Sequence, residues 1–188
     1  KHCWLKKLPA EKSAWVFAYG SLMWSPGFEY ESVLPAIIYG YHRRFCVFSH
    51  VYRGTPEAPG LFFGLDRGGS CWGRVFQIAP SKVSTVLGAI WDREMIYHVY
   101  VPRKLIAKTD NRRLTCHSFV VNPRHEQYAG LMDIACIARM IAGARGKAGS
   151  NLDYLINTLD HLEELGLRDE KLTRLRAAVR SLGDGRTC

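Results

Sequence analysis

The chain has 188 residues, of which 47% are hydrophobic and 12% aromatic, and it carries a formal net charge of +9. This composition excludes a globally disordered chain, and no apolar run approaches the roughly 20 residues that span a bilayer. The charge is divided almost equally, +4 in residues 1–94 and +5 in residues 95–188, so it does not form one basic arm. We attribute it mainly to solubility and to attraction for small anions.

The ends of the chain and its cysteines indicate the extent of the folded domain and the cellular compartment. Residues 1–13 are basic and lack the apolar segment of a secretory signal, and we expect them to be a mobile leader. A single domain is expected over residues 14–183, followed by a tail at 184–188. The six cysteines show neither C-x-x-C spacing nor a histidine pair at metal spacing, which argues against zinc. Reduced thiols in a cytoplasmic protein are therefore the default expectation.

Residues 15–24 begin with an apolar and aromatic run that is typical of a strand buried on both faces. The run ends in Tyr19-Gly20-Ser21-Leu22, a turn in which Gly20 has no Cβ and lets backbone N–H groups face a ligand. An ordinary strand followed by a glycine turn has the same sequence, so the turn alone does not identify a site.

The following part of the chain, up to residue 121, is rich in strand-forming residues. β-branched and aromatic residues predict strands there, bounded by Gly, Pro, Asn and Asp. We expect the glycine-rich stretch 66–70 and the polar stretch 110–113 to be turns between strands. The predicted strands cover residues 36–48, 61–65, 71–78, 95–108 and 114–121.

One helix is predicted within this strand-rich part. Apolar residues between Val83 and Trp91 form a single stripe at helical spacing. Pro80 suits the beginning of the helix, and we expect it to end near residues 92–94.

From about residue 129 onward, helical spacing replaces alternation. A first apolar helix face begins at Leu131, and Ser150 is expected to cap a second helix that ends at Gly166. A last helix is predicted over residues 169–182. Strands followed by helices predict an α+β fold.

Glu94 is the acidic residue best suited to general acid–base catalysis. It ends the predicted helix beside the apolar residues 95–97, so the negative end of the helix dipole and the loss of solvent should both raise its pKa. Such a shift brings the pKa toward the working pH, as this kind of catalysis requires. A surface glutamate paired with Arg93 is the alternative interpretation of the same residues.

Six segments, in this chain order, resemble motifs of the ChaC-like γ-glutamylcyclotransferases. The first is similar to the family's VFxYGSLxW opening, and the others to its HRRF strand, RGTPxxPG loop, xWG strand, Arg-Glu pair and N-x-x-Y-L segment. One such motif is weak evidence, whereas six in register are strong. In this chain the segments are residues 15–24, 41–46, 53–60, 71–73, 93–94 and 150–155.

The resemblance implies a small mixed β-barrel flanked by helices. It also implies cleavage of the γ-glutamyl amide of glutathione, which gives 5-oxoproline and Cys-Gly. Residues 19–22 are implied to line the γ-glutamyl pocket and Glu94 to be the acid/base. Arg53 and Tyr154 are the further candidates for substrate binding, although Tyr154, near the start of a predicted helix, could face either the pocket or the core.

The sequence departs from the family's pattern at Val51 and Tyr52, where the family usually has Asp-His before its Arg-Gly. The residues at the positions of Tyr97 and His98, shortly after Glu94, also vary among members of the family. The roles of these four positions stay open.

The implied chemistry makes modest demands on the protein. The α-amine of the substrate attacks its own γ-carbonyl, and such an internal nucleophile can reach an effective molarity of ~10⁵ M or more when it is held in place. The protein then supplies one base that moves the ammonium proton to the leaving amine, and backbone donors for the developing oxyanion. Neither a metal nor a cofactor is expected.

Other candidate sites are weaker. Ser21 lacks the G-x-S-x-G context of a hydrolytic nucleophile, and residues 143–150 break the phosphate-loop pattern because Ala148 follows Lys147. We interpret residues 143–150 as a charged loop between helices. The histidines that we weighed are scattered, and we interpret each as a packing or surface residue; they are His42, His98, His117 and His125.

Two further functions stay open at this point. One is a cyclotransferase for other γ-glutamyl amines or dipeptides. The other belongs to a different class, a basic module that binds nucleic acid, although the even distribution of charge disfavours it. The partner that we expect is a small-molecule substrate, without metal or membrane, and the oligomeric state is left open.

Overall fold

The computed structural model describes residues 13–184. The leader expected at residues 1–13 and the tail expected at residues 184–188 lie, but for one residue each, outside the described residues. The described chain divides into two compact units. The single domain expected over residues 14–183 stays a prediction.

The two units differ in secondary structure, and we name them accordingly. The barrel unit comprises residues 13–43 and 65–122, and the helical unit comprises residues 44–64 and 123–184. Both units are built from segments that are separated in the sequence. Each therefore depends on contacts that are distant along the chain.

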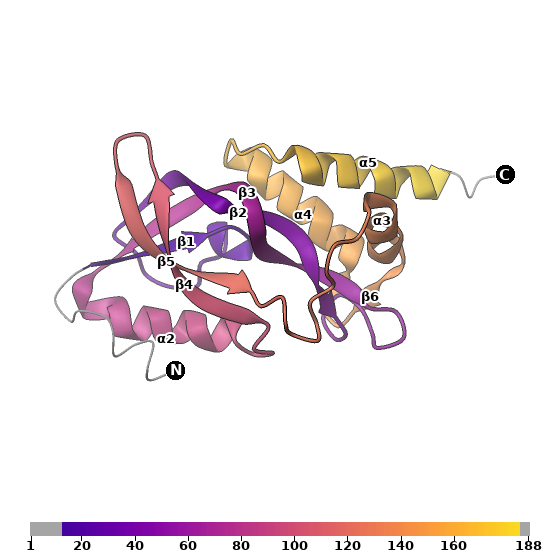
Figure 1. Cartoon of the computed structure of the whole chain (residues 1–188), viewed down its shortest axis with the longest axis horizontal. Coiled ribbons are helices and arrows are strands. Elements are labelled where there is room, and N and C mark those ends of the chain that lie inside the picture. The colour runs from indigo at the N-terminus through magenta and orange to yellow at the C-terminus, as the bar shows by residue number, and fades with distance from the viewer. Residues whose placement is uncertain (1–12, 185–188) are drawn as a thin grey trace. The chain divides into compact units, whose positions relative to one another are not determined.

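Five strands close into a barrel in the order β1-β3-β2-β4-β5 (Figure 1). Strand β1 pairs antiparallel with β3 but parallel with β5, so the sheet is mixed. The expected α+β fold with a mixed barrel and flanking helices is confirmed. Strands β2 and β3 are long enough to contribute residues to both units. The strands are β1 (Ala14–Ala18), β2 (Ser32–Ser49), β3 (Gly60–Ile78), β4 (Tyr100–Lys108) and β5 (Arg113–Val121).

The apolar run at the start of the described chain forms β1, as predicted. Its consecutive residues from Trp15 to Ala18 are all buried, so the strand is covered on both faces. Phe17, and Phe76 of the neighbouring strand β3, are each 1% exposed and belong to the core of the barrel unit. This buried strand holds the turn that follows it.

The turn expected at residues 66–70 was wrong, because β3 runs through this stretch without a break. Gly68 and Gly69 adopt positive φ values of 93° and 68°, which bend the strand without ending its pairing. The glycines therefore mark a bend within one long strand.

The strand expected from residue 95 begins only at Tyr100. Residues 95–99 instead form the turn that leaves the preceding helix, and His98 there has a positive φ of 56°. A residue other than glycine rarely adopts this left-handed conformation, and it is not the extended conformation of a strand. The strand was predicted to begin too early because the residues directly after Glu94 are apolar and resemble the start of a strand.

Helix α2 (Val83–Glu94) follows the short 3₁₀ helix η2 (Pro80–Lys82), so the predicted start at Pro80 and end near Glu94 are confirmed. Its apolar stripe is buried within the barrel unit, at Val83, Val86, Leu87 and Ile90.

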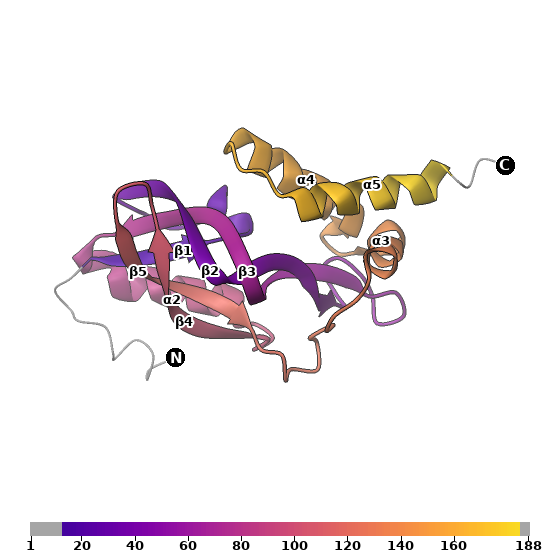
Figure 2. The same cartoon turned by 45° about the horizontal axis from the view of Figure 1, so that its top comes forward.

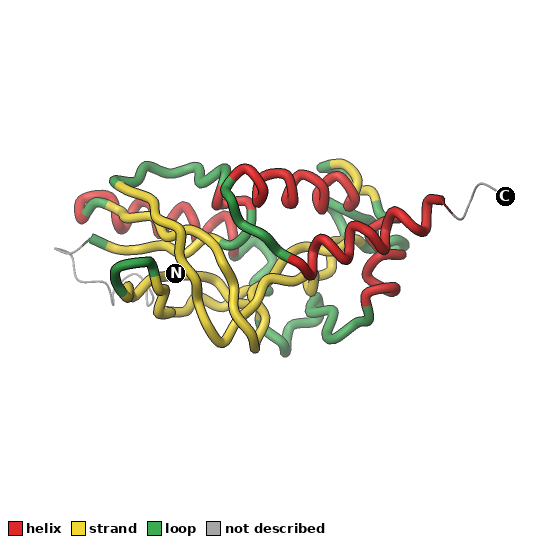
Figure 3. The backbone as a smooth tube through the Cα atoms, turned by 90° about the horizontal axis from the view of Figure 1, so that it is seen from above, coloured by secondary structure: helices red, strands yellow, loops and turns green. Residues whose placement is uncertain are grey.

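Three helices of the helical unit pack on one another (Figure 2). The tube in Figure 3 shows them in red, separated from one another by connecting segments. The first helix begins later than expected: Leu131 precedes it and is 89% exposed, and Asp133 caps its first turn by accepting from the Cys136 N–H. The helices are α3 (Ile134–Gly143), α4 (Asn151–Glu164) and α5 (Glu170–Asp184).

The predicted boundaries of α4 are confirmed. The Ser150 hydroxyl accepts from the Asp153 N–H at 3.0 Å, which is the expected N-cap. Gly166 follows the helix with a φ of 68°, the left-handed conformation that glycine adopts at a helix end. Between α3 and α4, the charged loop is a short antiparallel pair of β6 (Arg145–Gly146) and β7 (Gly149–Ser150).

Candidate active site

The turn after β1 combines buried anchors with an open backbone. Tyr19 and Leu22 are each 8% exposed, whereas Gly20 and Ser21 are partly exposed. A Cβ built on Gly20 would meet no other protein atom within 4 Å. Glycine is therefore not required here for packing, and the space above the Gly20 backbone is open to another molecule.

The backbone of this turn offers hydrogen-bond donors. Ser21–Met23 form a 3₁₀ helix, η1, whose first internal bond runs from the Met23 N–H to the Gly20 carbonyl at 2.9 Å. Within the described residues, the Ser21 and Leu22 N–H groups donate to no backbone carbonyl, as is general for the first donors of a helical turn. They can stabilise negative charge that develops nearby.

Glu94 is the last residue of α2 and belongs to the same barrel unit as the turn. Its side chain is 19% exposed. Burial raises the pKa of this carboxyl above its ordinary value, and the neighbouring charge of Arg93 opposes the rise. The predicted direction of the shift is thus confirmed, and burial is its main cause.

Arg93 connects this carboxylate with the turn. Its Nη2 donates to the Ser21 hydroxyl at 2.8 Å, its Nη1 donates to the Ser25 carbonyl at 3.0 Å, and its Nε lies 3.7 Å from Glu94 Oε1. One guanidinium group therefore contacts Glu94 and both ends of the segment that contains η1. The sequence predicted Arg93 only as a possible partner of Glu94 and as part of the Arg-Glu pair, and its contact with Ser21 was missed.

Arg53 and Tyr154 lie together in the helical unit. The Arg53 guanidinium carbon is 5.1 Å from the centre of the Tyr154 ring, and its Nη1 donates to the Ser150 carbonyl at 3.2 Å. The Tyr154 ring also contacts Phe45, Phe62 and Phe63. The tyrosine is thus held by aromatic packing and also contacts a cation.

Close backbone packing holds the loop that begins at Arg53. A Cβ on Gly60 would collide with the carbonyl group of Arg53, whose carbon would be 2.7 Å away. The fully buried Asn151 side chain accepts from the Leu61 N–H at 2.6 Å and donates to the Leu61 carbonyl at 2.9 Å. This structural role of Asn151, the first residue of α4, was missed, although its position in the N-x-x-Y-L segment was a signal.

The structure therefore groups the site residues into two sets. In the barrel unit, Arg93 joins the turn at residues 19–22 to Glu94. In the helical unit, Arg53 pairs with Tyr154. The signal that could have identified Arg93 is its place one residue before the catalytic candidate, at the end of a helix.

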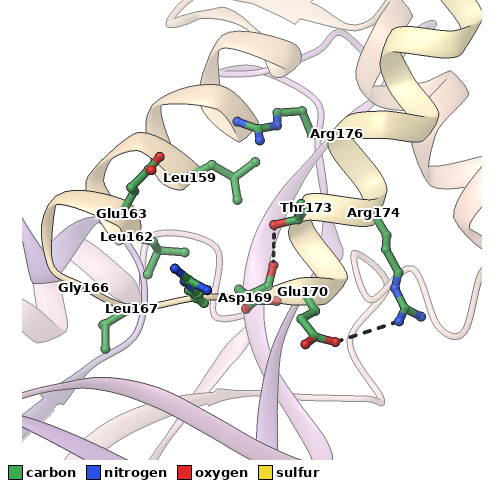
Figure 4. Close-up of a pocket in the computed structure, with 11 residues that line it drawn as sticks. Leu159, Leu162, Glu163, Gly166, Leu167, Asp169, Glu170, Thr173, Arg174 and Arg176 are labelled. Carbon is green, nitrogen blue, oxygen red and sulfur yellow. Dashed lines mark hydrogen bonds and ion pairs between the residues drawn. The ribbon is translucent and has the colours of Figure 1, made fainter.

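A cavity of about 790 Å³ lies between α4 and α5 in the helical unit (Figure 4). Leu159, Leu162 and Leu167 contribute apolar surface to it. Its rim includes an exposed ion pair between Arg174 and Glu170, with a nitrogen-to-oxygen distance of 3.9 Å. None of the site residues predicted from the sequence lines this cavity.

Other classes of site have little support in the described part of the chain. Residues 13–184 contain no group of three or more His, Cys, Asp and Glu side chains that could hold a metal ion. No helix among them is both long and apolar enough to cross a bilayer. His117 is buried in β5, and burial lowers its pKa to about 4, which fits the packing role that we expected.

Comparison with known proteins bears on both fold and family. Residues 14–182 match the family model described as ChaC-like protein. The chain belongs to this ChaC-like family. A relative from Escherichia coli, glutathione-specific γ-glutamylcyclotransferase, is 34% identical over 93% of this chain and 76% of its own length. The enzyme of that name from Schizosaccharomyces pombe is 31% identical over 94% of this chain and 97% of its own.

Solved structures agree with the fold of this ChaC-like protein. A γ-glutamyl cyclotransferase specific to glutathione from yeast superposes with a TM-score of 0.80, over 91% of this chain and 99% of that one. At 22% identity, this likeness concerns the fold. It supports the mixed barrel with flanking helices.

Proposed function

We propose that this protein is a glutathione-specific γ-glutamylcyclotransferase. The family and the named relatives support the activity. The observation within the molecule that carries the proposal is a mostly buried carboxylate of raised pKa, linked through one arginine to a turn with an open backbone. That combination supplies a proton carrier and oxyanion donors without a nucleophilic side chain.

The reaction is an intramolecular acyl transfer. The α-amine nitrogen of the glutamyl group forms a bond to the γ-carbonyl carbon and closes a five-membered ring. The bond from that carbon to the cysteine nitrogen then breaks, which gives 5-oxoproline and Cys-Gly. The proton lost by the attacking amine is the one that the leaving nitrogen needs, so the step consumes no water.

Glu94 is the group that we propose to carry this proton. Its raised pKa places it closer to neutral pH than an ordinary glutamate, so it can accept a proton and return it within one turnover. Because the same carboxyl group performs both transfers, no second acid is required.

The turn is proposed to bind the γ-glutamyl group. The N–H groups of Ser21 and Leu22 are the donors for the oxyanion, and open space above Gly20 admits the substrate. The buried side chains of Tyr19 and Leu22 keep the backbone in place. Removing one such donor in other enzymes slows turnover by roughly 10²- to 10³-fold.

Arg53 and Tyr154 are proposed to bind the substrate as well. The cation and the aromatic face that they combine suit a ligand with a carboxylate and an apolar stem, as glutathione has. This assignment stays a prediction and is tested separately from Glu94 and the turn.

Substrate range and location complete the proposal. We expect glutathione to be preferred over other γ-glutamyl amines, as the names of the relatives indicate. A basic nucleic-acid-binding module is not favoured by these relatives. We expect a cytoplasmic enzyme that needs neither a metal nor a cofactor.

The decisive experiment follows the products formed from glutathione. We expect 5-oxoproline and Cys-Gly in equal amounts, an unchanged rate in EDTA, and no reaction of glutathione with an acetylated α-amine. Glutamate as the first product, or rapid cleavage of the acetylated analogue, would rule out ring closure. Comparison of γ-glutamyl dipeptides with glutathione at equal concentration tests the specificity.

A further inference from the structure

We propose that Arg93 is a positioning residue that holds the turn at Gly20–Leu22 and the Glu94 carboxylate in the arrangement needed for ring closure. The inference rests on the proposed function and adds a residue to it. Arg93 does not react in this proposal. It acts through the groups that it holds.

The three nitrogens of its guanidinium group have three different partners. Nη2 donates to the Ser21 hydroxyl, Nη1 donates to the Ser25 carbonyl, and Nε faces Glu94 Oε1. Nη1 also lies 3.5 Å from the Pro26 carbonyl. The planar group therefore fixes the turn and the carboxylate relative to each other, since its bond angles do not vary.

This arrangement is suited to orientation more than to global stability. The Arg93 side chain is 38% exposed, and an ion pair at such a position contributes little to folding. Orientation is a more sensitive quantity, because a displacement of about 1 Å at a reacting group can slow turnover roughly 100-fold. Loss of Arg93 should thus affect catalysis before it affects the fold.

The charge of Arg93 has a second effect on the same carboxylate. Burial raises the pKa of Glu94, and Arg93 lowers it. Without this cation, the pKa of Glu94 rises further, and the fraction of enzyme with an ionised base at a given acidic pH falls. A change in the pH profile is therefore a signature that a purely structural role would not produce.

Arg74 provides a matched control. Its Nη1 donates to the Met23 carbonyl at 3.0 Å, at the end of η1, and its guanidinium lies over the Phe76 ring at 5.6 Å. It thus contacts the η1 helix next to the turn, while the contacts to Ser21 and Glu94 belong to Arg93. Both residues lie in the barrel unit.

The test compares Arg93→Met, Arg93→Lys and Arg74→Met by steady-state kinetics with glutathione, pH profiles and thermal unfolding. We expect Arg93→Met to lower kcat about 10- to 100-fold with a smaller change in KM, and to move the acidic limb of kcat/KM to higher pH. Arg93→Lys keeps the positive charge but not the planar guanidinium group. The acidic limb of its kcat/KM profile should therefore return toward the wild-type pH, while kcat stays low. Arg74→Met should change kcat less than about threefold and leave the limb in place.

Two outcomes would overturn the inference. One is a kcat and pH profile of Arg93→Met that match those of Arg74→Met. The other is a folded Arg93→Lys variant with wild-type kcat, which decides the matter even where Arg93→Met unfolds. Failure of the proposed function is distinct, because the wild-type protein would then release no 5-oxoproline from glutathione.

Discussion

The turn at residues 19–22 and the loop that begins at Arg53 carry most of the predicted functional residues, and they are held in place by different means. In the barrel unit, one partly exposed arginine side chain links the turn to Glu94. In the helical unit, the loop is fixed by the close backbone approach of Gly60 to Arg53 and by the buried Asn151. The first relies on the hydrogen bonds of a partly exposed side chain, and the second on close backbone packing and the hydrogen bonds of a buried side chain.

The difference indicates whether a substitution in each region should affect activity or stability. Open space above Gly20 is of no use to packing but admits a ligand, so a substitution there should affect activity more than stability. The absence of space at Gly60 has the opposite consequence. Effects on activity and on stability should therefore separate between Gly20 and Gly60.

The largest effect is expected at the proton carrier itself. Glu94→Gln retains the size of the side chain but cannot accept a proton, so kcat should fall by about 10²- to 10⁴-fold. The fold should survive, as checked by circular dichroism and thermal unfolding. Near wild-type kcat in the folded variant would show that Glu94 is not the acid/base.

The comparison between the regions is tested directly by a pair of glycine substitutions. Gly60→Ala places a Cβ against the Arg53 carbonyl group and should reduce the free energy of unfolding by about 1–3 kcal/mol. Gly20→Ala meets no protein atom and should change it by less than about 0.5 kcal/mol, yet lower kcat/KM about 10- to 100-fold.

Denaturant unfolding and kinetics on both variants measure these effects. A stable Gly60→Ala variant would show that the loop relaxes easily. A fully active Gly20→Ala variant would remove the turn from the substrate site.

A smaller effect is expected in the helical unit at Arg53. Arg53→Met should raise KM about tenfold with little change in kcat, because a charge-assisted hydrogen bond contributes roughly 1.5–3 kcal/mol and this one would bind substrate and transition state alike. Lys147→Met, at an exposed position of the neighbouring β6–β7 turn, is the control for lost charge. Equal KM values for the two variants would exclude Arg53 from binding.

The smallest effect is a pH dependence set by Glu94. Its pKa in the folded protein lies above the ordinary 4.5 because burial disfavours the carboxylate. Activity needs the ionised form, so kcat/KM should fall as the pH drops through this raised pKa. An acidic limb at or below pH 4.5 would contradict the assignment.

The same shift affects stability with a definite sign. A raised pKa contributes stability below the unfolded value of 4.5, and that contribution is lost as the pH rises through the folded pKa. Glu94→Gln has no such loss. Its free energy of unfolding relative to wild type should therefore increase from pH 4 to neutral pH, which denaturant titrations at several pH values can measure.

The amino-acid sequence by itself determined the local elements and the candidates for chemistry. The buried strand before Gly20, the helix that ends at Glu94, the Ser150 cap and the Gly166 helix end follow from short-range periodicity and backbone preference, which act within a few residues. Glu94 could be singled out because its dipole position and apolar neighbours are adjacent in the chain.

Only the tertiary structure decided how these elements are joined. The closed strand order and the continuity of β3 through Gly68 depend on pairing between distant segments, which no local pattern specifies. The link from Arg93 to Ser21 spans 72 residues, so its existence could not be read from either motif. The sequence identifies residue types that are able to react, whereas long-range packing determines which of them meet.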